Sequence, residues 1–176
     1  MKKSLVLLAA FLLVLPAAAL ADADEEVAYK AEFIISLVDN IEWPEDGEAG
    51  DNDEFVIYVV GECPVQGKLQ ELADDASEDG KNIAVKVVSF TDDLSESDIL
   101  FKPSDDLSML AKELKKVKGS KTVTVADAEH FARYGVMISF FESEKDSEIH
   151  YEVNKLVVES AGISLSAKVL DKAEQI

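Results

Sequence analysis

KAEFIISLVDNIEWP, residues 30–44, predicts an amphipathic helix that packs on the core and ends abruptly. Apolar residues recur here at spacings of three and four and therefore share one helical face: Val27, Ala31, Ile34, Val38 and Ile41. The charged residues between them are expected to point away from this face: Lys30, Glu32, Asp39 and Glu42. Trp43 precedes Pro44, and a residue before proline disfavours the helical region, so we expect the chain to turn there.

Residues 1–21 have the organisation of a secretory signal peptide. Lys2 and Lys3 precede an apolar run from Leu5 to Leu15, and small residues surround Ala21. The run is shorter than the roughly twenty residues of a spanning helix, which argues against a membrane anchor. Cleavage is predicted after Ala21 or Ala23, which leaves residues 22–176 as one mature domain. No cysteine follows the small residues, so a lipoprotein anchor is not indicated.

The charge balance excludes nucleic-acid binding. The chain has 36 acidic and 17 basic residues, a net charge of -19, and Arg133 is its only arginine. Because phosphate recognition needs clustered Lys and Arg, such a chain repels DNA and RNA. The acidic coat indicates a solvated surface. Residues 45–53, EDGEAGDND, are predicted to form an exposed loop.

Strands and helices alternate along the rest of the chain. Strands are predicted at 54–60, 83–90, 99–101, 121–125, 136–142 and 147–153. Helices are predicted at 67–76, 107–117, 128–134, 155–160 and 166–174. This order predicts a single-domain layered α/β fold with a mostly parallel sheet. The polar residues 143–146 predict a hairpin that forms an antiparallel edge.

Three segments resemble known ligand-binding loops, but each lacks a residue or a spacing that its loop requires. The stretch from Gly61 to Lys68 lacks the spacing and the hydroxyl of a phosphate-binding loop, which favours a tight strand-to-helix turn. Residues 75–80 resemble half of a calcium loop, but Lys86 stands where a carboxylate is required. Residues 50–55, GDNDEF, have the wrong register for a diguanylate cyclase signature. We therefore predict no cofactor and no metal site.

The remaining chemically reactive residues are few. His130 and His150 are the two histidines and are too isolated to indicate a metal site or a triad, and His150 is expected to face solvent. Cys63 is the single cysteine, so it is either buried as a small apolar group, which we favour, or available for an intermolecular bridge. No nucleophile with a plausible base is found, and we predict that the protein is not an enzyme.

Four segments in the same order resemble the YfiR-like family of periplasmic proteins from Gram-negative bacteria. They are residues 30–44, DDLSESDILFKPS at 92–104, TVTVADAEHFARYGVMISF at 122–140, and HYEVNKLVVESAGISLSAKVL at 150–170. The resemblance covers nearly all of the chain after residue 26. It implies a Rossmann-like α/β sandwich and location in the periplasm. Relatives often carry a cysteine where this chain has Ser97, so disulfide-based redox control is not implied here.

The resemblance also implies a function and its partners. YfiR-like proteins bind the sensory domain of an inner-membrane diguanylate cyclase and repress it, which restrains cyclic di-GMP signalling and biofilm formation. A histidine kinase sensory domain is a related form of this partner. An outer-membrane lipoprotein and a second copy in a homodimer are further partners that the family suggests. The required mechanism is a higher affinity for the inactive partner than for the active one.

Six residues are candidates for the partner interface. Four lie in the terminal motif and two elsewhere: Tyr151, Glu152, Ile163, Leu165, Phe140 and Trp43. The alternative for each is a role in core packing. For Trp43 the alternatives differ in energy, because Trp43→Ala should cost about 3 kcal/mol if the ring is buried and below about 0.5 kcal/mol if it lies on the surface.

Two other classes of function stay open. A periplasmic small-ligand-binding module of a sensory or transport system would place its pocket beyond the carboxyl ends of the strands, near Gly61 to Pro64 or Ser104. An enzyme would need a polar residue whose change abolishes turnover. Fold resemblance alone does not choose among these classes.

Overall fold

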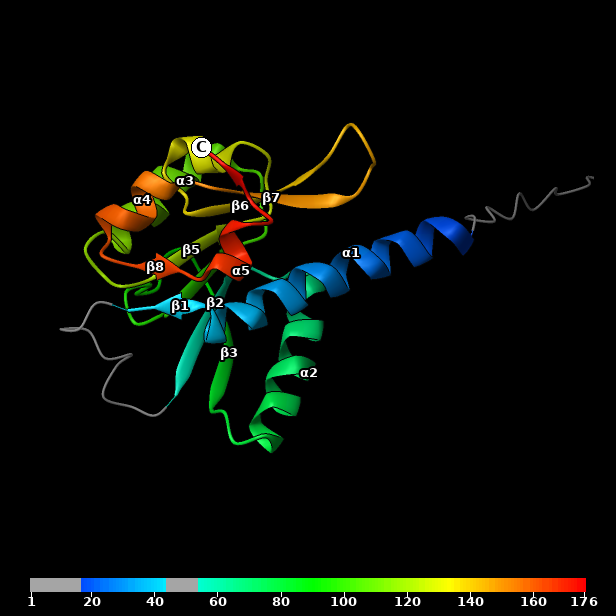
Figure 1. Ribbon diagram of the computed structural model, residues 1–176. Helices are drawn as coiled ribbons and strands as arrows, with labels where there is room; N and C mark the ends of the chain where they lie inside the picture. The colour runs from blue at the N-terminus through cyan, green and yellow to red at the C-terminus, as the bar shows by residue number, and fades with distance from the viewer. Residues whose placement is uncertain (1–16, 44–53) are drawn as a thin grey trace, which may run out of the picture.

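The computed structural model of the chain describes residues 17–43 and 54–176 (Figure 1). Five α-helices lie in this part: α1 (Ala17–Ser36), α2 (Pro64–Glu78), α3 (Leu107–Lys116), α4 (Lys155–Ser160) and α5 (Ala167–Leu170). Two 3-10 helices follow α1 and β5, respectively: η1 (Leu37–Asp39) and η2 (Phe131–Tyr134). The strands are β1 (Ile41–Glu42), β2 (Phe55–Val60), β3 (Ile83–Val88), β4 (Ile99–Lys102), β5 (Val123–Ala126), β6 (Ile138–Glu142), β7 (Ile149–Val153), β8 (Ser164–Leu165) and β9 (Glu174–Gln175).

Seven strands form the main sheet in the order β3-β2-β4-β5-β6-β7-β9. All neighbours pair in parallel except β6 and β7, which form the antiparallel hairpin expected from the sequence. The predicted fold class, α/β with a mostly parallel sheet, is therefore confirmed. The hairpin is not the outermost pair, because the two-residue strand β9 lies beyond β7.

The central strands are apolar because both faces of the sheet are covered. Every residue of β4 and β5 is buried, as expected for parallel strands between two layers. On one face, α1 and α2 pack on Ile57, Val59 and Phe101. On the other face, Tyr58 and Leu100 pack on the loop around Leu94.

Helix α1 differs from its prediction at both ends. It begins at Ala17, inside the predicted signal peptide, whose residues 1–16 lie outside the described residues. Its N-terminal part extends beyond the sheet in Figure 1. The helix ends at Ser36 instead of continuing to Ile41, which pairs with Leu165 on β8. Asn40 stabilises this end, since its side-chain amide donates to the Ser36 carbonyl at 2.6 Å.

The C-terminal helix is also shorter than predicted. Residues 166–174 were expected to be helical, but α5 spans only Ala167–Leu170. The chain then reaches the sheet edge, where Glu174 lies opposite Glu152 and the Ile176 amide donates to the Val153 carbonyl at 3.1 Å. Residues 171–174 were predicted to be helical, but they lead to the sheet edge, where the β7 backbone offers hydrogen-bond partners.

Two further expectations can be compared with the structure. Gly61 has a φ of +85° in the turn between β2 and α2, which confirms the tight strand-to-helix turn. Residues 75–78 belong to α2 and so do not form a calcium loop. The predicted loop at residues 45–53 lies outside the described residues. Among the described helices, none combines the length and apolarity needed to cross a membrane.

Candidate functional site

Helix α1 is held on the sheet by a buried lysine. Lys30 is 5% exposed, and its Nζ donates to Oδ1 of Asp127 at 2.6 Å and also contacts the Glu26 carboxylate. The expectation that Lys30 points away from the core is therefore wrong. Asp127 follows β5, so the ion pair joins α1 to the carboxyl end of that strand. A charge at this depth requires such a partner.

Aromatic side chains continue the α1 contact along β6 and β7. The Phe33 ring lies 4.3 Å from the Tyr151 ring and 5.3 Å from the Phe140 ring, centroid to centroid. The Tyr29 ring packs edge-on against Phe140 at 6.4 Å and is 39% exposed. The Tyr151 hydroxyl donates to the Val169 carbonyl at 2.7 Å, which links this group of aromatic rings to α5. Burial raises the pKa of Tyr151 to about 12, so the hydroxyl remains a donor at neutral pH.

A cavity of about 200 Å³ opens between α1 and α5. Phe33 and Tyr151 line it together with the polar residues Asn40 and Ser36. Its rim consists of two residues from α1 and two basic residues, which we call the α1–α5 surface: Tyr29, Glu32, Lys168 and Lys172. An exposed aromatic beside exposed charged side chains is typical of protein contact sites.

The structure places most of the sequence-predicted interface candidates in the core. Five are buried: Phe140 at 1% exposure, Ile163 at 2%, Tyr151 at 3%, Glu152 at 4% and Leu165 at 7%. Trp43 is half-buried and its ring lies 6.4 Å from that of Phe55. The packing alternative thus describes the five buried positions, and only Tyr151 lines the α1–α5 cavity. A direct contact of any of the six with a partner stays a prediction.

Glu152 occupies an unusual position among these candidates. It lies opposite Ser139 in the β6–β7 register, and Glu152 Oε1 and Ser139 Oγ are buried without a hydrogen-bond partner among the described residues. Burial raises the pKa of the Glu152 carboxyl, and the nearby charges of His130 and Arg133 oppose this shift. A buried acid of this kind destabilises the native state when it is ionised.

The carboxyl ends of the strands carry polar residues that are already paired. Lys102 at the end of β4 and Glu113 on α3 form a buried ion pair with Nζ 3.1 Å from Oε2.

Cys63 is the N-cap of α2 and is half-buried against the core, whereas burial was favoured from the sequence. Burial raises the pKa of its thiol, which keeps the thiol protonated and weakly nucleophilic. Ser104 is exposed.

The two histidines lie apart. His130 has a φ of +69° before η2 and sits beside Glu129. His150 is partly exposed on β7, stacks on Phe141, and its Nε2 lies 3.2 Å from Asp146 Oδ1. Asp146, Glu148 and His150 bring their ligand atoms within 4.8 Å of one another. An exposed group of this kind is common without any ion and carries no assignment here.

Sequence reasoning missed the residues of the α1–α5 surface. Tyr29 packs on Phe140, but in the sequence it falls between the positions of the apolar face that was predicted for the first helix. Lys168 and Lys172 lie in the segment predicted as a helix, residues 166–174, where basic residues indicate a solvated surface. No local signal distinguishes them, because the cavity forms only when α5 docks beside α1.

The comparisons with known proteins agree with this architecture. A family model described as YfiR/HmsC-like matches residues 27–174. A solved structure of a conserved domain protein from Vibrio cholerae has a TM-score of 0.55 at 14% identity, covering 85% of this chain and 59% of that one. An ABC domain from Streptococcus pneumonia, solved in complex with L-Trp, has a TM-score of 0.50 at 15% identity, with coverages of 69% and 54%. This chain thus spans less than two thirds of either structure, and at these identities the likeness concerns the fold. The search of curated proteins gives no match.

Proposed function

The chain belongs to the YfiR/HmsC-like family, and we propose that it is an exported periplasmic regulator that binds and represses the sensory domain of an inner-membrane signalling protein. The family match over residues 27–174 is the observation that carries this proposal. A diguanylate cyclase is the expected partner, so the output is a lower cyclic di-GMP level. The sensory domain of a histidine kinase is the second form of partner.

The α1–α5 surface is the proposed docking site. Tyr29 offers a partly exposed ring that is held by Phe140, and Lys168 and Lys172 supply positive charge beside it. Rigid aromatic anchors of this type contribute much of the energy of protein interfaces. Repression follows if the partner's inactive conformation binds this surface better than its active conformation.

The state of the polar residues supports binding over catalysis. Lys30 and Lys102 are each held in ion pairs with carboxylates, and burial raises the pKa of the Cys63 thiol. A nucleophile needs a lowered pKa or an adjacent base. The groups at the carboxyl ends of the strands therefore suit structural roles.

The proposal is tested by measuring cyclic di-GMP in cells that express the candidate cyclase with and without this protein. We expect a lower level with the protein, and crosslinking from these cells should recover the cyclase. Tyr29→Ala with Lys168→Glu and Lys172→Glu should abolish repression and crosslinking, while the protein remains folded by circular dichroism. The control variant Lys86→Glu with Lys145→Glu changes exposed lysines elsewhere and should repress normally.

Each outcome has a defined meaning. Unchanged cyclic di-GMP together with no crosslinked membrane protein would overturn the proposed function. Repression that survives the triple substitution would overturn only the proposed docking surface. Crosslinks to an outer-membrane lipoprotein or to a second copy of the chain would identify the two further partners that the family suggests.

A further inference from the structure

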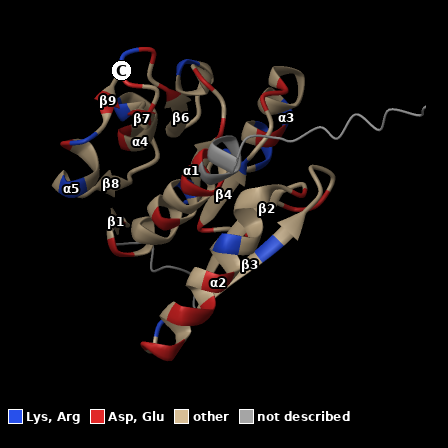
Figure 2. Cartoon of the chain, turned by 90° about the vertical axis from the view of Figure 1, so that its right-hand side faces the viewer, with Lys and Arg blue, Asp and Glu red and all other residues tan. Residues whose placement is uncertain are grey.

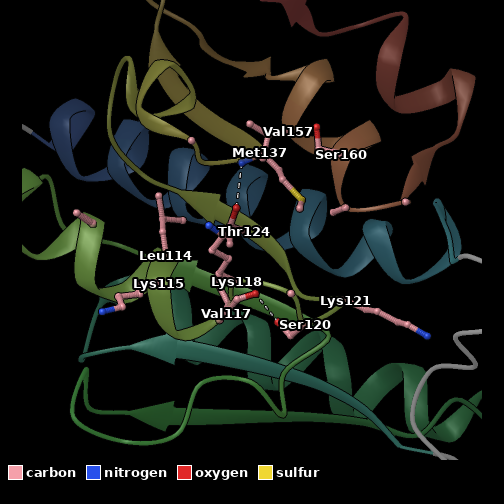
Figure 3. Close-up of a pocket in the computed structure, with 15 residues that line it drawn as sticks. Leu114, Lys115, Val117, Lys118, Ser120, Lys121, Thr124, Met137, Val157 and Ser160 are labelled. Carbon is pink, nitrogen blue, oxygen red and sulfur yellow. Dashed lines mark hydrogen bonds between the residues drawn. The ribbon is translucent and has the colours of Figure 1, made fainter.

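A groove of about 1180 Å³ lies at the amino ends of the strands (Figure 3). The alternative ligand-binding function would instead have its pocket beyond the carboxyl ends of the strands. Its walls are the C-terminal end of α3 and the C-terminal end of α4. Its floor comes from the amino ends of β5 and β6, through Thr124 and Met137. Small-molecule sites of proteins have volumes of about 300 to 1,000 Å³, so the groove is large enough for an organic ligand.

The charge of the groove is opposite to that of the molecule. The lining includes Lys115, Lys118 and Lys121 and no acidic residue, although the chain has 36 acidic residues and a net charge of -19. Figure 2 shows both basic and acidic residues on α3, whereas acidic residues predominate on α1 and α2. In the part of the chain that the structure describes, no carboxylate lies within 4.0 Å of these three lysines. Their charges are therefore available to a ligand.

The interior of the groove is apolar between these charges. Val117 and Met137 are buried at 6% and 5% exposure, and Leu114 and Val157 are partly buried. Lys115 and Lys121 lie at opposite ends of the groove in Figure 3. The Thr124 hydroxyl accepts a hydrogen bond from the Met137 amide at 3.0 Å, so this polar group is already satisfied. The groove thus combines an apolar floor with a cationic rim.

We propose that this groove binds a small anionic amphiphile, with an acyl chain on the apolar floor and a carboxylate head at the lysine rim. Burial of the chain supplies the affinity, and the lysines select the anionic head over a neutral or cationic one. A second copy of the chain is a poorer occupant, because two molecules with a net charge of -19 repel each other. The proposal goes beyond the regulatory function and does not depend on it.

Isothermal titration calorimetry of the protein with dodecanoate, kept in its monomeric form, tests the proposal. We expect saturable binding of one dodecanoate per chain. Butyrate, which has the head without the chain, and dodecyl maltoside, which has the chain without the charge, should bind much more weakly. Absence of dodecanoate binding, or equal binding of dodecyl maltoside, would overturn the proposal.

Substitutions locate the binding in the groove. Lys115→Gln, Lys118→Gln and Lys121→Gln together should weaken dodecanoate binding by about tenfold, because the carboxylate loses one exposed ion pair and the longer-range attraction of the other two charges. Lys68→Gln, Lys86→Gln and Lys145→Gln change the net charge equally, lie outside the groove, and should leave binding unchanged. Ala111→Trp fills the groove from an exposed position of α3 and should prevent binding without disturbing the core.

Methionine-methyl NMR gives a readout that does not depend on the variants. The Met137 signal should shift on addition of dodecanoate, because Met137 lines the groove, whereas the Met109 signal should not, because Met109 does not. Shifts at Met109 alone would place the ligand elsewhere and contradict the assignment. Sedimentation tests the other occupant. If the wild type is a dimer, the Lys115→Gln, Lys118→Gln and Lys121→Gln variant is a monomer, and dodecanoate does not bind, then the occupant is a second copy and the proposal fails.

Discussion

The Lys30–Asp127 pair joins α1 to the sheet across 97 positions of the sequence. Lys30 is more deeply buried than its partner, with side-chain exposures of 6% and 25%. Removal of Asp127 therefore leaves the more costly charge behind, with only the partly exposed Glu26 to compensate it.

We predict that Asp127→Ala lowers the free energy of unfolding by about 2 kcal/mol, less than for a fully buried pair because Glu26 remains. Lys30→Met keeps the volume and removes the buried charge, so it should cost less than about 1 kcal/mol. Urea titration of both variants measures the difference. Equal losses for the two would contradict the greater cost of leaving the buried Lys30 charge unpaired.

Glu152 should make stability depend on pH. Its folded-state pKa is raised by burial above the ordinary value. The native state therefore favours the protonated form, and this stability is fully present below the unfolded pKa and lost as pH rises through the folded pKa. Glu152→Gln should be more stable than the wild type at pH 7 and equal to it near pH 4. Thermal unfolding of both proteins at these pH values checks the sign, and a destabilised variant at pH 7 would refute it.

Trp43 is neither fully buried nor exposed, so its substitution should have an intermediate effect. Trp43→Ala should lower the free energy of unfolding by about 2 kcal/mol, since the ring packs beside Phe55 at the rim of the core. Trp43→Phe should cost less because it retains the aromatic contact. Guanidinium unfolding followed by circular dichroism measures both, and a loss below about 0.5 kcal/mol for alanine would assign the ring to the surface.

The end of α1 depends on an element from the far end of the chain. Asn40 bonds the Ser36 carbonyl through its amide nitrogen and accepts from the Ser166 hydroxyl at 2.6 Å through its amide oxygen. The Ser166 amide also donates to the Asn40 carbonyl at 3.0 Å. These bonds align β1 with β8, the two-stranded sheet that no periodicity indicated.

Asn40→Ala should lower the free energy of unfolding by about 2 kcal/mol, because two side-chain hydrogen bonds are lost and the Ser36 carbonyl is left without its cap. Ser166→Ala removes one of these bonds and should cost about half as much. Hydrogen exchange should show faster exchange at Leu165 and Ser166 in both variants. Unchanged exchange there would mean that backbone pairing alone holds β1 and β8.

The whole molecule carries a net charge of -19, and its acidic residues are widely distributed (Figure 2). Like charges spread over a folded chain repel one another and favour expansion. The lysine-lined groove is an exception of opposite sign, so its attraction for anions should also weaken with ionic strength.

Salt should stabilise the protein. A rise from about 10 mM to about 500 mM potassium chloride shortens the screening length from roughly 30 Å to a few Å, so the repulsion decreases. We expect the melting temperature to rise by several degrees, as measured by differential scanning calorimetry. Potassium acetate at equal ionic strength is the control for specific chloride binding. A melting temperature that is flat or falls with both salts would contradict the role of repulsion.

Local patterns were sufficient for most elements of the fold. Continuous apolar runs such as residues 55–60 mark strands that are covered on both sides, and alternation of these runs with helical stripes indicates a parallel sheet. These signals depend on neighbours within one element, and they were confirmed for the sheet, the hairpin and the turn at Gly61.

Contacts between residues that are distant in the sequence determined the features that local patterns did not predict. Lys30 is buried because Asp127, directly after β5, pairs with it. Ile41 is a strand residue because Leu165 offers it backbone partners, and β9 forms because β7 presents an open edge. The α1–α5 surface and the lysine-lined groove arise where α5 and α4 dock beside other elements. A one-dimensional pattern contains the preference of each segment but not the position of its partners, and the free energy of burying and pairing these groups overrides the local preference.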